Sequence, residues 1–242
     1  MTIKWPHVEV DPHCDREDVN GVKEFYSDSH VQARDFDGAV PFYVDCVTQL
    51  LVSMEPGSLF EFGCNAGRNL HLLSQKLPHA RLYGVDVNRD AIDFGREYFN
   101  LPIEYGDELF LEKLAEDSFE VTFTVSVLDH IPFIEEVARK LIQITSRYLV
   151  LYEICYHRFG KITQMATADG EIVDGYPFSY FHDYDGLFRK LGTWCVLDVA
   201  LPAFPGNLGE FYRLKVFSKH SADIGKQLLK RIAFSPLHPS SR

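Results

Sequence analysis

Short apolar runs separated by helical patterns recur along most of this chain. The runs are rich in β-branched and aromatic side chains, as buried parallel strands are, and they cover residues 58–62, 81–86, 101–105, 119–128 and 148–154. The pattern predicts helices at residues 39–54, after residue 67, after residue 88, at residues 132–144 and at residues 182–191. Two further strands are expected at residues 193–200 and 210–218. Such an alternation is typical of an α/β fold with a parallel sheet.

The domain organisation follows from length and from the distribution of turn residues. The chain has 242 residues, of which 46% are hydrophobic, and this suits one α/β domain with additions. We expect an N-terminal cap over residues 1–38, a domain over residues 39–218 and a tail over residues 219–242 that forms a helix and then becomes disordered. Residues 155–180 contain several Gly and a Pro and are expected to form a long insertion after the fifth strand.

Charge, cysteine usage and hydropathy exclude several classes of protein. The net charge is −11, from 24 basic and 35 acidic residues, which disfavours nucleic acid as a partner because phosphate neutralisation needs clustered Lys and Arg. The five cysteines are scattered and form no Cys-x-x-Cys pair, so we expect a cytoplasmic protein without a structural zinc site. No apolar stretch approaches the roughly twenty residues of a membrane span, and the first residues lack the apolar core of a signal peptide, so no membrane association is expected.

The most informative segment joins the first strand to the helix that follows it. An apolar run leads into Glu61, Gly63 and Gly67 before a helical pattern begins. Glycine permits positive φ and allows the backbone to approach a ligand closely, and the first N–H groups of a helix point toward whatever lies in such a turn. The segment therefore predicts a site for a small polar ligand at the end of the first strand. A turn that only connects a strand to a helix is the alternative.

The spacing of the glycines separates two classes of nucleotide ligand. A dinucleotide fingerprint needs glycines at the first, third and sixth positions, and here the third is Asn65 and the sixth is Arg68. The segment instead resembles motif I of the class I S-adenosylmethionine-dependent methyltransferases, Glu/Asp-x-Gly-x-Gly-x-Gly, and reads Glu61-Phe62-Gly63-Cys64-Asn65-Ala66-Gly67. Asn65 replaces the middle glycine, and Asn tolerates left-handed φ better than most residues.

The resemblance extends over about residues 39–218 and is strongest over residues 58–132. It implies a three-layer Rossmann-like fold with a seven-stranded, mostly parallel sheet whose last strand is antiparallel. It also implies S-adenosyl-L-methionine as the cofactor and S-adenosyl-L-homocysteine as the product. The cofactor contacts that the resemblance implies are Glu61, Gly63, Cys64, Asn65, Gly67, Asn69, Asp86, Val87, Asp107, Glu108, Val125 and Ser126.

Two acidic positions after the second and third strands have competing interpretations. Asp86 lies nineteen residues after Gly67, where an acid can accept hydrogen bonds from both ribose hydroxyls of a nucleoside, or can cap the next helix. Asp107, with Glu108 beside it, is the family's position for contact with the adenine amino group, or lies in an exposed Gly-Asp turn. Since ligands of parallel sheets bind at the carboxyl ends of the strands, all of these positions are expected at one edge.

The fourth strand ends in Asp129-His130, which resembles the short Leu-x-His-Ile/Val segment of motif IV in the same family. An oxygen acceptor, or a protonated amine, needs a base, and His has a suitable unperturbed pKa. His130 and Asp129 are therefore the catalytic candidates. The alternative for His130 is a structural role, in packing against the loop or the cofactor.

Acceptor recognition is expected from the cap and the insertion, where aromatic residues concentrate. Tyr26, Tyr156, Tyr180 and His182 are the candidate contacts, and ordinary core packing is the alternative for most of the aromatic side chains. Glu153, His157, His182 and Asp183 have no spacing that supports a metal site, so no metal is expected.

The sequence thus predicts a methyltransferase that acts on oxygen or nitrogen of a small molecule, by in-line displacement at the sulfonium methyl. A non-catalytic module that binds S-adenosylmethionine or a nucleoside on the same fold is the alternative from another class. An NAD-dependent oxidoreductase is a third, disfavoured by the glycine spacing. The identity of the acceptor, the attacked atom and the oligomeric state stay open.

Overall fold

The computed structural model describes residues 9–11, 16–27, 39–157, 159–166, 172–174, 178–201 and 211–220. Its centre is a seven-stranded sheet with the order β10-β11-β6-β5-β2-β3-β4. The strands are β2 (Ser58–Phe62), β3 (Arg81–Asp86), β4 (Ile103–Tyr105), β5 (Phe119–Val125), β6 (Thr145–Ile154), β10 (Trp194–Ala200) and β11 (Tyr212–Ser218). Five neighbouring strands, β6, β5, β2, β3 and β4, are parallel to one another, and β11 runs antiparallel to both of its neighbours, β6 and β10. This arrangement confirms the fold predicted from the sequence.

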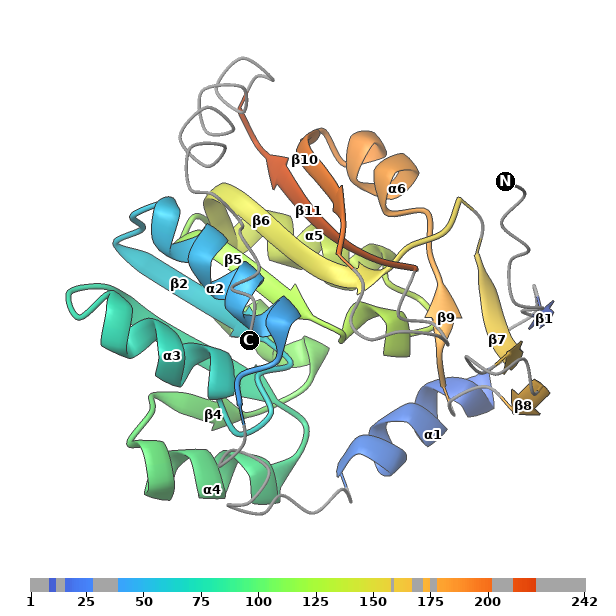
Figure 1. Cartoon of the computed structure of the whole chain (residues 1–242), viewed down its shortest axis with the longest axis horizontal. Helices are drawn as coiled ribbons and strands as arrows, with labels where there is room; N and C mark the ends of the chain where they lie inside the picture. Colours follow the sequence, from blue (N-terminus) through green and yellow to red (C-terminus); the bar gives the residue numbers. More distant parts are fainter. Residues whose placement is uncertain are drawn as a thin grey trace.

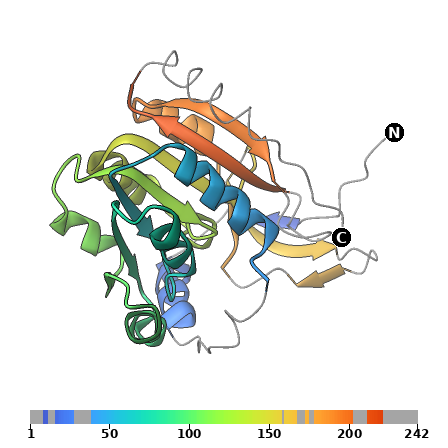
Figure 2. The same cartoon turned by 60° about the vertical axis from the view of Figure 1, so that its left-hand side comes forward.

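Helices cover both faces of this sheet. One side carries α2 (Phe42–Ser53), α3 (Arg68–Lys76) and α4 (Arg89–Phe99), and the other carries α5 (Glu135–Ile144), α6 (Tyr184–Lys190) and the short 3-10 helices η2 (Glu108–Lys113) and η3 (Leu128–His130). Figure 1 shows these three layers, and Figure 2 shows α2 lying across the sheet. The predicted helix at residues 39–54 begins later because Pro41 occupies its N-cap, where its fixed φ is compatible with the helix start.

Alternation along each strand divides the core between the two faces. Leu59 and Val150 pack in the cluster under α2 and α3, whereas their neighbours Phe60 and Leu149 pack under α5 and α6. Successive strand residues point to opposite faces, so a sheet that is covered on both sides needs nearly continuous apolar runs. This is why the parallel strands could be recognised as unbroken hydrophobic segments.

The N-terminal segment and the insertion form a second, smaller sheet. It contains β1 (Glu9–Asp11), β7 (Gly160–Ala166), β8 (Ile172–Asp174) and β9 (Tyr180–Phe181), and β7 pairs with each of the other three. This sheet lies beside the main one, and α1 (Arg16–Ser27) lies next to it (Figure 1). The cap and the insertion, which are far apart in the sequence, are therefore joined through β1 and β7.

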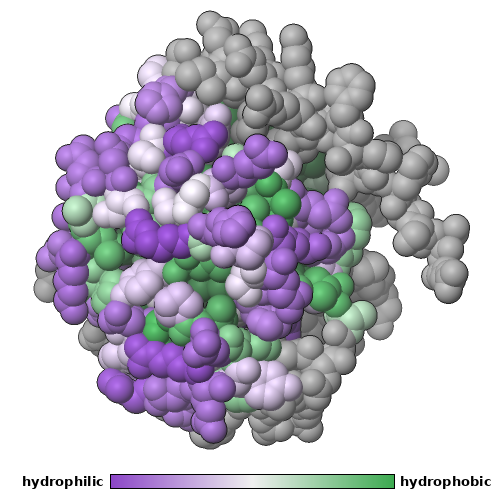
Figure 3. Space-filling model, turned by 90° about the vertical axis from the view of Figure 1, so that its left-hand side faces the viewer, coloured by the Kyte–Doolittle hydropathy of each residue, from purple (hydrophilic) through white to green (hydrophobic). Residues whose placement is uncertain are grey.

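The helix and disordered end predicted for the tail fall on residues 221–242 and lie outside the described residues. Within the described part of the chain, no helix combines the length and the apolar character that crossing a bilayer requires. The face shown in Figure 3 carries hydrophilic residues over much of its described surface, with separate hydrophobic patches between them.

Candidate functional site

A cavity of about 560 Å³ opens at the carboxyl ends of the parallel strands, beneath α1. Its walls come from the ends of β2, β3 and β5, from the segments that follow them, and from α1 and α5. The lining residues are Val22, Lys23, Tyr26, Phe62, Gly63, Asn65, Val85, Asp86, Val87, Gly106, Glu108, Val125, Ser126, Val127, His130, Ile131, Pro132, Phe133, Glu136 and Val137. Residues from five separate segments thus meet at the edge where ligands of parallel sheets bind.

The turn after β2 has the left-handed backbone that its sequence predicts. Gly63, Asn65 and Gly67 have φ values of 75°, 48° and 81°. Gly63 is also required by packing, since a Cβ there would lie 2.3 Å from a methyl group of Val127. Asn65 occupies a region that Asn adopts more readily than most residues, so the missing middle glycine leaves the shape of the turn intact.

Asp86 is held rigidly at the cavity wall by the backbone. Its Oδ2 accepts from the Asn65 amide at 2.7 Å and its Oδ1 accepts from the Asn88 amide at 2.8 Å. The N-cap of α4 is Asn88, whose side chain accepts from Ala91, so Asp86 is not the capping residue. Burial raises the pKa of Asp86, while these amide donors oppose that shift. A carboxylate has about four lone-pair sites, so Asp86 retains acceptor capacity for a ligand.

Three further residues of the motif lie behind the turn and do not line the cavity. The Glu61 Oε1 accepts from Asn69 at 2.5 Å, and burial raises the pKa of Glu61 well above its ordinary range. The Glu61 Oε2 is buried and has no hydrogen-bond partner among the described residues. Cys64 is buried against Gly84, where a Cβ would lie 3.0 Å from its sulfur. These three side chains support the turn from inside the core.

Asp107 and Glu108 are tied to the cap. Lys23 of α1 donates to Asp107 Oδ2 at 2.9 Å and to Glu108 Oε1 at 2.7 Å. The other oxygen of Asp107 accepts from Leu109 and caps η2. Lys23 and the Leu109 amide lower the pKa of Asp107 against the opposing effect of burial. Glu108 lines the cavity and Asp107 does not, and the carboxylate of Asp107 is 31% exposed while it pairs with Lys23.

We expect replacement of Lys23 by Met to speed dissociation of S-adenosylhomocysteine by about two- to fivefold. The ion pairs of Lys23 are partly exposed, and such pairs contribute up to about 1 kcal/mol, so the effect is modest. Stopped-flow dissociation measures it, with Lys113→Met on η2 as the control for loss of a lysine. An unchanged rate would show that Lys23 does not hold α1 over the cavity.

Two other contacts fix α1 above the cavity. Asn88 Nδ2 donates to the carbonyl of Tyr26 at 3.0 Å, and the ring of Tyr26 lies 4.7 Å from the ring of His130. Gly21 allows α1 to approach the insertion, because a Cβ there would lie 2.7 Å from the ring of Phe178. α1 is therefore a wall of the cavity held on one side by the sheet and on the other by the insertion.

His130 presents a neutral imidazole at this wall. Its Nδ1 lies 3.0 Å from the carbonyl oxygen of Phe178, and its Nε2 lies 3.9 Å from Asp129 Oδ1. A carbonyl only accepts hydrogen bonds, so Nδ1 carries the proton and Nε2 holds the lone pair. Burial lowers the pKa of His130, which keeps the ring neutral at pH 7. Asp129 itself is completely buried and does not line the cavity.

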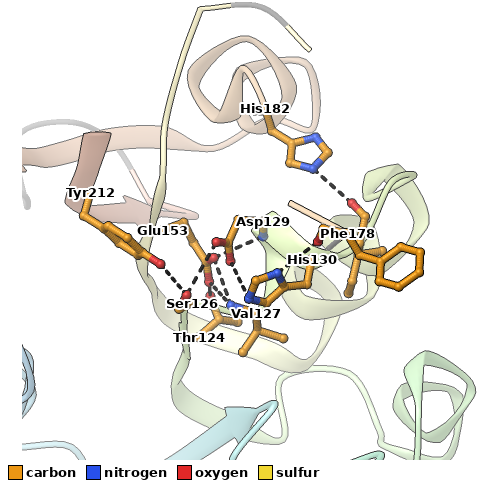
Figure 4. A network of polar contacts seen from close by, with 10 residues as sticks. Thr124, Ser126, Val127, Asp129, His130, Glu153, Phe178, His182 and Tyr212 are labelled. Carbon is orange, nitrogen blue, oxygen red and sulfur yellow. Dashed lines mark hydrogen bonds and ion pairs between the residues drawn. The ribbon is translucent and has the colours of Figure 1, made fainter. Parts of the chain in front are cut away.

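A polar network continues from His130 into the core (Figure 4). Glu153, at the end of β6, accepts from Thr124 Oγ1 at 2.6 Å and from the amides of Val127 and Asp129. The hydroxyl groups of Ser126 and Tyr212 are 2.6 Å apart. No sequence signal placed Glu153 or Tyr212 at the site, except that Glu153 is a lone carboxylate in an apolar strand.

The four residues that the sequence suggested as contacts for the acceptor do not lie together in the structure. Tyr26 lines the cavity, whereas Tyr156, Tyr180 and His182 do not. The ring of Tyr156 packs 5.1 Å from that of Phe181, and Tyr180 is buried. His182 Nε2 lies 3.0 Å from the Ile131 carbonyl, and burial lowers the pKa of His182 to about 4. Core packing, which was the alternative interpretation, describes the surroundings of Tyr180 and His182, whereas Tyr156 is 41% exposed.

Of the sequence-predicted residues, the cavity brings together Gly63, Asn65, Asp86, Val87, Glu108, Val125, Ser126, His130 and Tyr26. The lining residues that the sequence did not indicate include Lys23 and Glu136, which lie on helices with no motif of their own. In the described part of the chain, no three His, Cys, Asp or Glu side chains are grouped so as to hold a metal ion.

Solved structures of methyltransferases are similar to this fold. The 1,6-didemethyltoxoflavin-N1-methyltransferase of Burkholderia thailandensis, with its acceptor and S-adenosylhomocysteine bound, has a TM-score of 0.62 at 11% identity over 91% of this chain and 98% of that protein. The complex of DhpI with S-adenosylhomocysteine has a TM-score of 0.55 at 14% identity over 85% and 98%. An O-methyltransferase family protein from B. thailandensis has a TM-score of 0.53 at 15% identity over 74% of this chain but 55% of that one. At these identities the likeness shows the fold.

The family comparison adds the activity class. Residues 60–147 match the family model of a methyltransferase domain, which spans the glycine turn, Asp86 and the Asp129-His130 segment. No curated protein matches the chain at a significant level. The domain match over residues 60–147 supports a class I S-adenosylmethionine-dependent methyltransferase with S-adenosylmethionine as its cofactor, and the seven-stranded sheet has the Rossmann-like fold of the similar methyltransferases.

Proposed function

We propose that this enzyme transfers the methyl group of S-adenosylmethionine to an oxygen or nitrogen atom of a small molecule that binds in the cavity under α1. The observation that carries the proposal is the composition of that one cavity. The cavity is lined both by Gly63, Asn65 and Asp86, the expected cofactor contacts, and by His130, the proposed base. A methyl donor and an acceptor bound together would meet between them.

The residues at the first wall fit the cofactor. Asp86 is a fixed carboxylate with lone pairs to spare for ribose hydroxyls, and Glu108 lies at the end of β4 where the adenine is expected. The cavity lining contains three acidic residues, Asp86, Glu108 and Glu136, and one lysine, Lys23. A wall of this charge suits a ligand that carries a sulfonium and an ammonium group. When bound, the cofactor supplies a methyl group that is already activated for displacement.

The second wall suits a small acceptor without negative charge. It consists of apolar side chains from Ile131, Pro132, Phe133 and Val137, with His130 and Tyr26 above them. The apolar surface orients a ring or chain and excludes water, and orientation of two reactants can supply roughly 7–11 kcal/mol of a barrier. An anionic acceptor such as a nucleic acid is disfavoured by the acidic lining residues. A small-molecule acceptor in the similar Burkholderia structure supports the same class.

Binding measurements test the cofactor half of the proposal. We expect S-adenosylmethionine and S-adenosylhomocysteine to bind with micromolar affinity in isothermal titration calorimetry, and NAD not to bind. Transfer of radiolabelled methyl groups to a panel of phenols, carboxyl-free heterocycles and amines then tests the acceptor half. Cofactor binding without transfer to any acceptor class would favour a binding module, and absence of cofactor binding would overturn the proposal.

A further inference from the structure

Two carboxyl groups lie side by side behind His130, and both are completely buried. Asp129 on η3 and Glu153 at the end of β6 each have 0% of their surface exposed. The structure describes no Lys or Arg that pairs with either of them. Placing an isolated carboxylate in such surroundings is very unfavourable, so the structure must either satisfy their charges or hold protons on them.

The surroundings satisfy one negative charge. Glu153 accepts hydrogen bonds from Thr124 Oγ1 at 2.6 Å, from the Val127 amide at 3.0 Å and from the Asp129 amide at 3.2 Å. Asp129 Oδ2 has a 3.4 Å contact with the Ser126 hydroxyl, and Asp129 Oδ1 has no hydrogen-bond partner among the described residues. Burial raises the pKa of both carboxyls, and the charge of Asp129 raises that of Glu153 further. The pair therefore holds one proton and one negative charge.

This shared charge faces the base. Asp129 Oδ1 is the oxygen that lies 3.9 Å from His130 Nε2, the nitrogen with the lone pair. The other titratable groups around the pair are Cys155, which follows β6, Tyr184 of α6, Tyr212 of β11 and His182, which follows β9. Tyr26 of α1 lies across His130, and Lys23 and Glu136 line the same cavity. Burial raises the pKa of Cys155, Tyr184 and Tyr212, and lowers that of His182, so these four stay neutral between pH 6 and 9.

We propose that Glu153 is a positioning residue for methyl transfer, which acts by sharing a proton with Asp129 and so setting the charge that His130 meets at Nε2. The inference rests on the proposed function of His130 as the base. When the acceptor attacks, a bond forms between its oxygen or nitrogen and the methyl carbon, and the carbon–sulfur bond breaks with its electron pair on sulfur. The acceptor proton passes to Nε2. The positive charge lost by the sulfonium then resides on an imidazolium beside the buried negative charge.

The proposal predicts opposite changes for the two carboxyls. With Glu153→Gln the negative charge is confined to Asp129, next to Nε2, so the titration midpoint of His130 rises by about one pH unit. With Asp129→Asn the charge is confined to Glu153, farther from Nε2, so the midpoint falls. The acidic limb of the pH profile of kcat/KM moves in the same directions, since only neutral His130 accepts a proton. A merely structural role would move neither midpoint.

NMR titration of the His130 Cε1 proton in the full chain is the measurement, with the resonance assigned by its loss in His130→Gln. Asp117→Asn is the matched control, because Asp117 is exposed before the start of β5, at the opposite end from the pair. Thr124→Val is the substitute if Glu153→Gln fails to fold. It keeps both carboxyls but removes a hydrogen-bond donor to Glu153, which disfavours the negative charge there. The charge then moves toward Asp129, so the titration midpoint of His130 is again expected to rise. Circular dichroism establishes that each variant is folded.

Opposite shifts of the His130 midpoint in folded Glu153→Gln and Asp129→Asn variants would support the shared proton. Shifts in the same direction, or no shift in either variant, would overturn the proposal. The titration needs neither cofactor nor acceptor. Opposite shifts in a protein that transfers no methyl group would therefore support the coupling and count against the proposed transfer alone. Transfer by a wild-type enzyme whose variants show no shift would count against the coupling alone.

Discussion

Replacing Asp86 with alanine is expected to weaken binding of S-adenosylmethionine by about a hundredfold or more. The substitution removes the proposed acceptor for two ribose hydroxyls, and hydrogen bonds to a charged group contribute about 1.5–3 kcal/mol each. It also leaves the amides of Asn65 and Asn88 without the acceptor that they have in the structure. Calorimetric titration of the cofactor gives the change in Kd directly.

Two variants make this result specific to the ribose contact. Asp93→Ala removes an exposed aspartate of α4, seven residues farther along, and should leave the Kd unchanged. Asp86→Asn keeps one acceptor oxygen and a similar shape, so its loss of affinity should lie between those of the wild type and Asp86→Ala. A change of less than about threefold in Asp86→Ala would contradict the assignment of the ribose contact.

His130→Gln is expected to lower kcat by about 10²–10⁴-fold, the usual range for loss of a general acid–base group. The amide of Gln can still donate to the Phe178 carbonyl, so the loop keeps its hydrogen bond and the effect isolates proton transfer. Cofactor affinity should change little, because His130 stands at the acceptor side of the cavity. Steady-state assays with an identified acceptor measure both quantities.

The pH profile distinguishes catalysis by His130 from packing. Burial lowers the pKa of His130 below its ordinary value of about 6.5, so the wild-type enzyme keeps its neutral base, and its activity, down to a pH below that value and loses activity as the pH falls further. In His130→Gln this acidic limb should disappear. His79→Gln, at an exposed histidine before β3, should retain the wild-type profile. A variant that keeps both rate and limb would show that His130 only packs against Tyr26 and the loop.

The cavity wall at the strand ends could be predicted because each part of it is local. Gly63, Asn65 and Gly67 adopt left-handed backbone, which Gly and Asn favour locally, and Asp86 is the last residue of an apolar strand. Parallel strands bring their carboxyl ends to one edge, so a sequence that marks each strand end with a polar residue also predicts where those residues meet. The predicted contacts at Val87, Val125 and Ser126 line the cavity for the same reason.

The acceptor side could not be predicted in the same way. Tyr156, Tyr180 and His182 are aromatic residues in the expected segment, but an aromatic ring packs in a core as readily as against a ligand. Which of these happens depends on the path of the insertion: the ring of Tyr156 packs near that of Phe181, Tyr180 on β9 is buried, and His182 faces the Ile131 carbonyl. Tyr26 reaches the cavity because α1 crosses above it.

The amino-acid sequence by itself determined the order of the strands and helices of the main sheet, the left-handed turn after β2 and the polar residues at the strand ends, since these depend on periodicity and on backbone preferences within a few residues. Only the tertiary structure decided that Lys23 meets Asp107, 84 residues away, and that Glu153 meets Asp129. Such contacts depend on how distant segments pack and on which polar groups become buried together. Neither the packing of distant segments nor the joint burial of polar groups can be predicted from local sequence patterns.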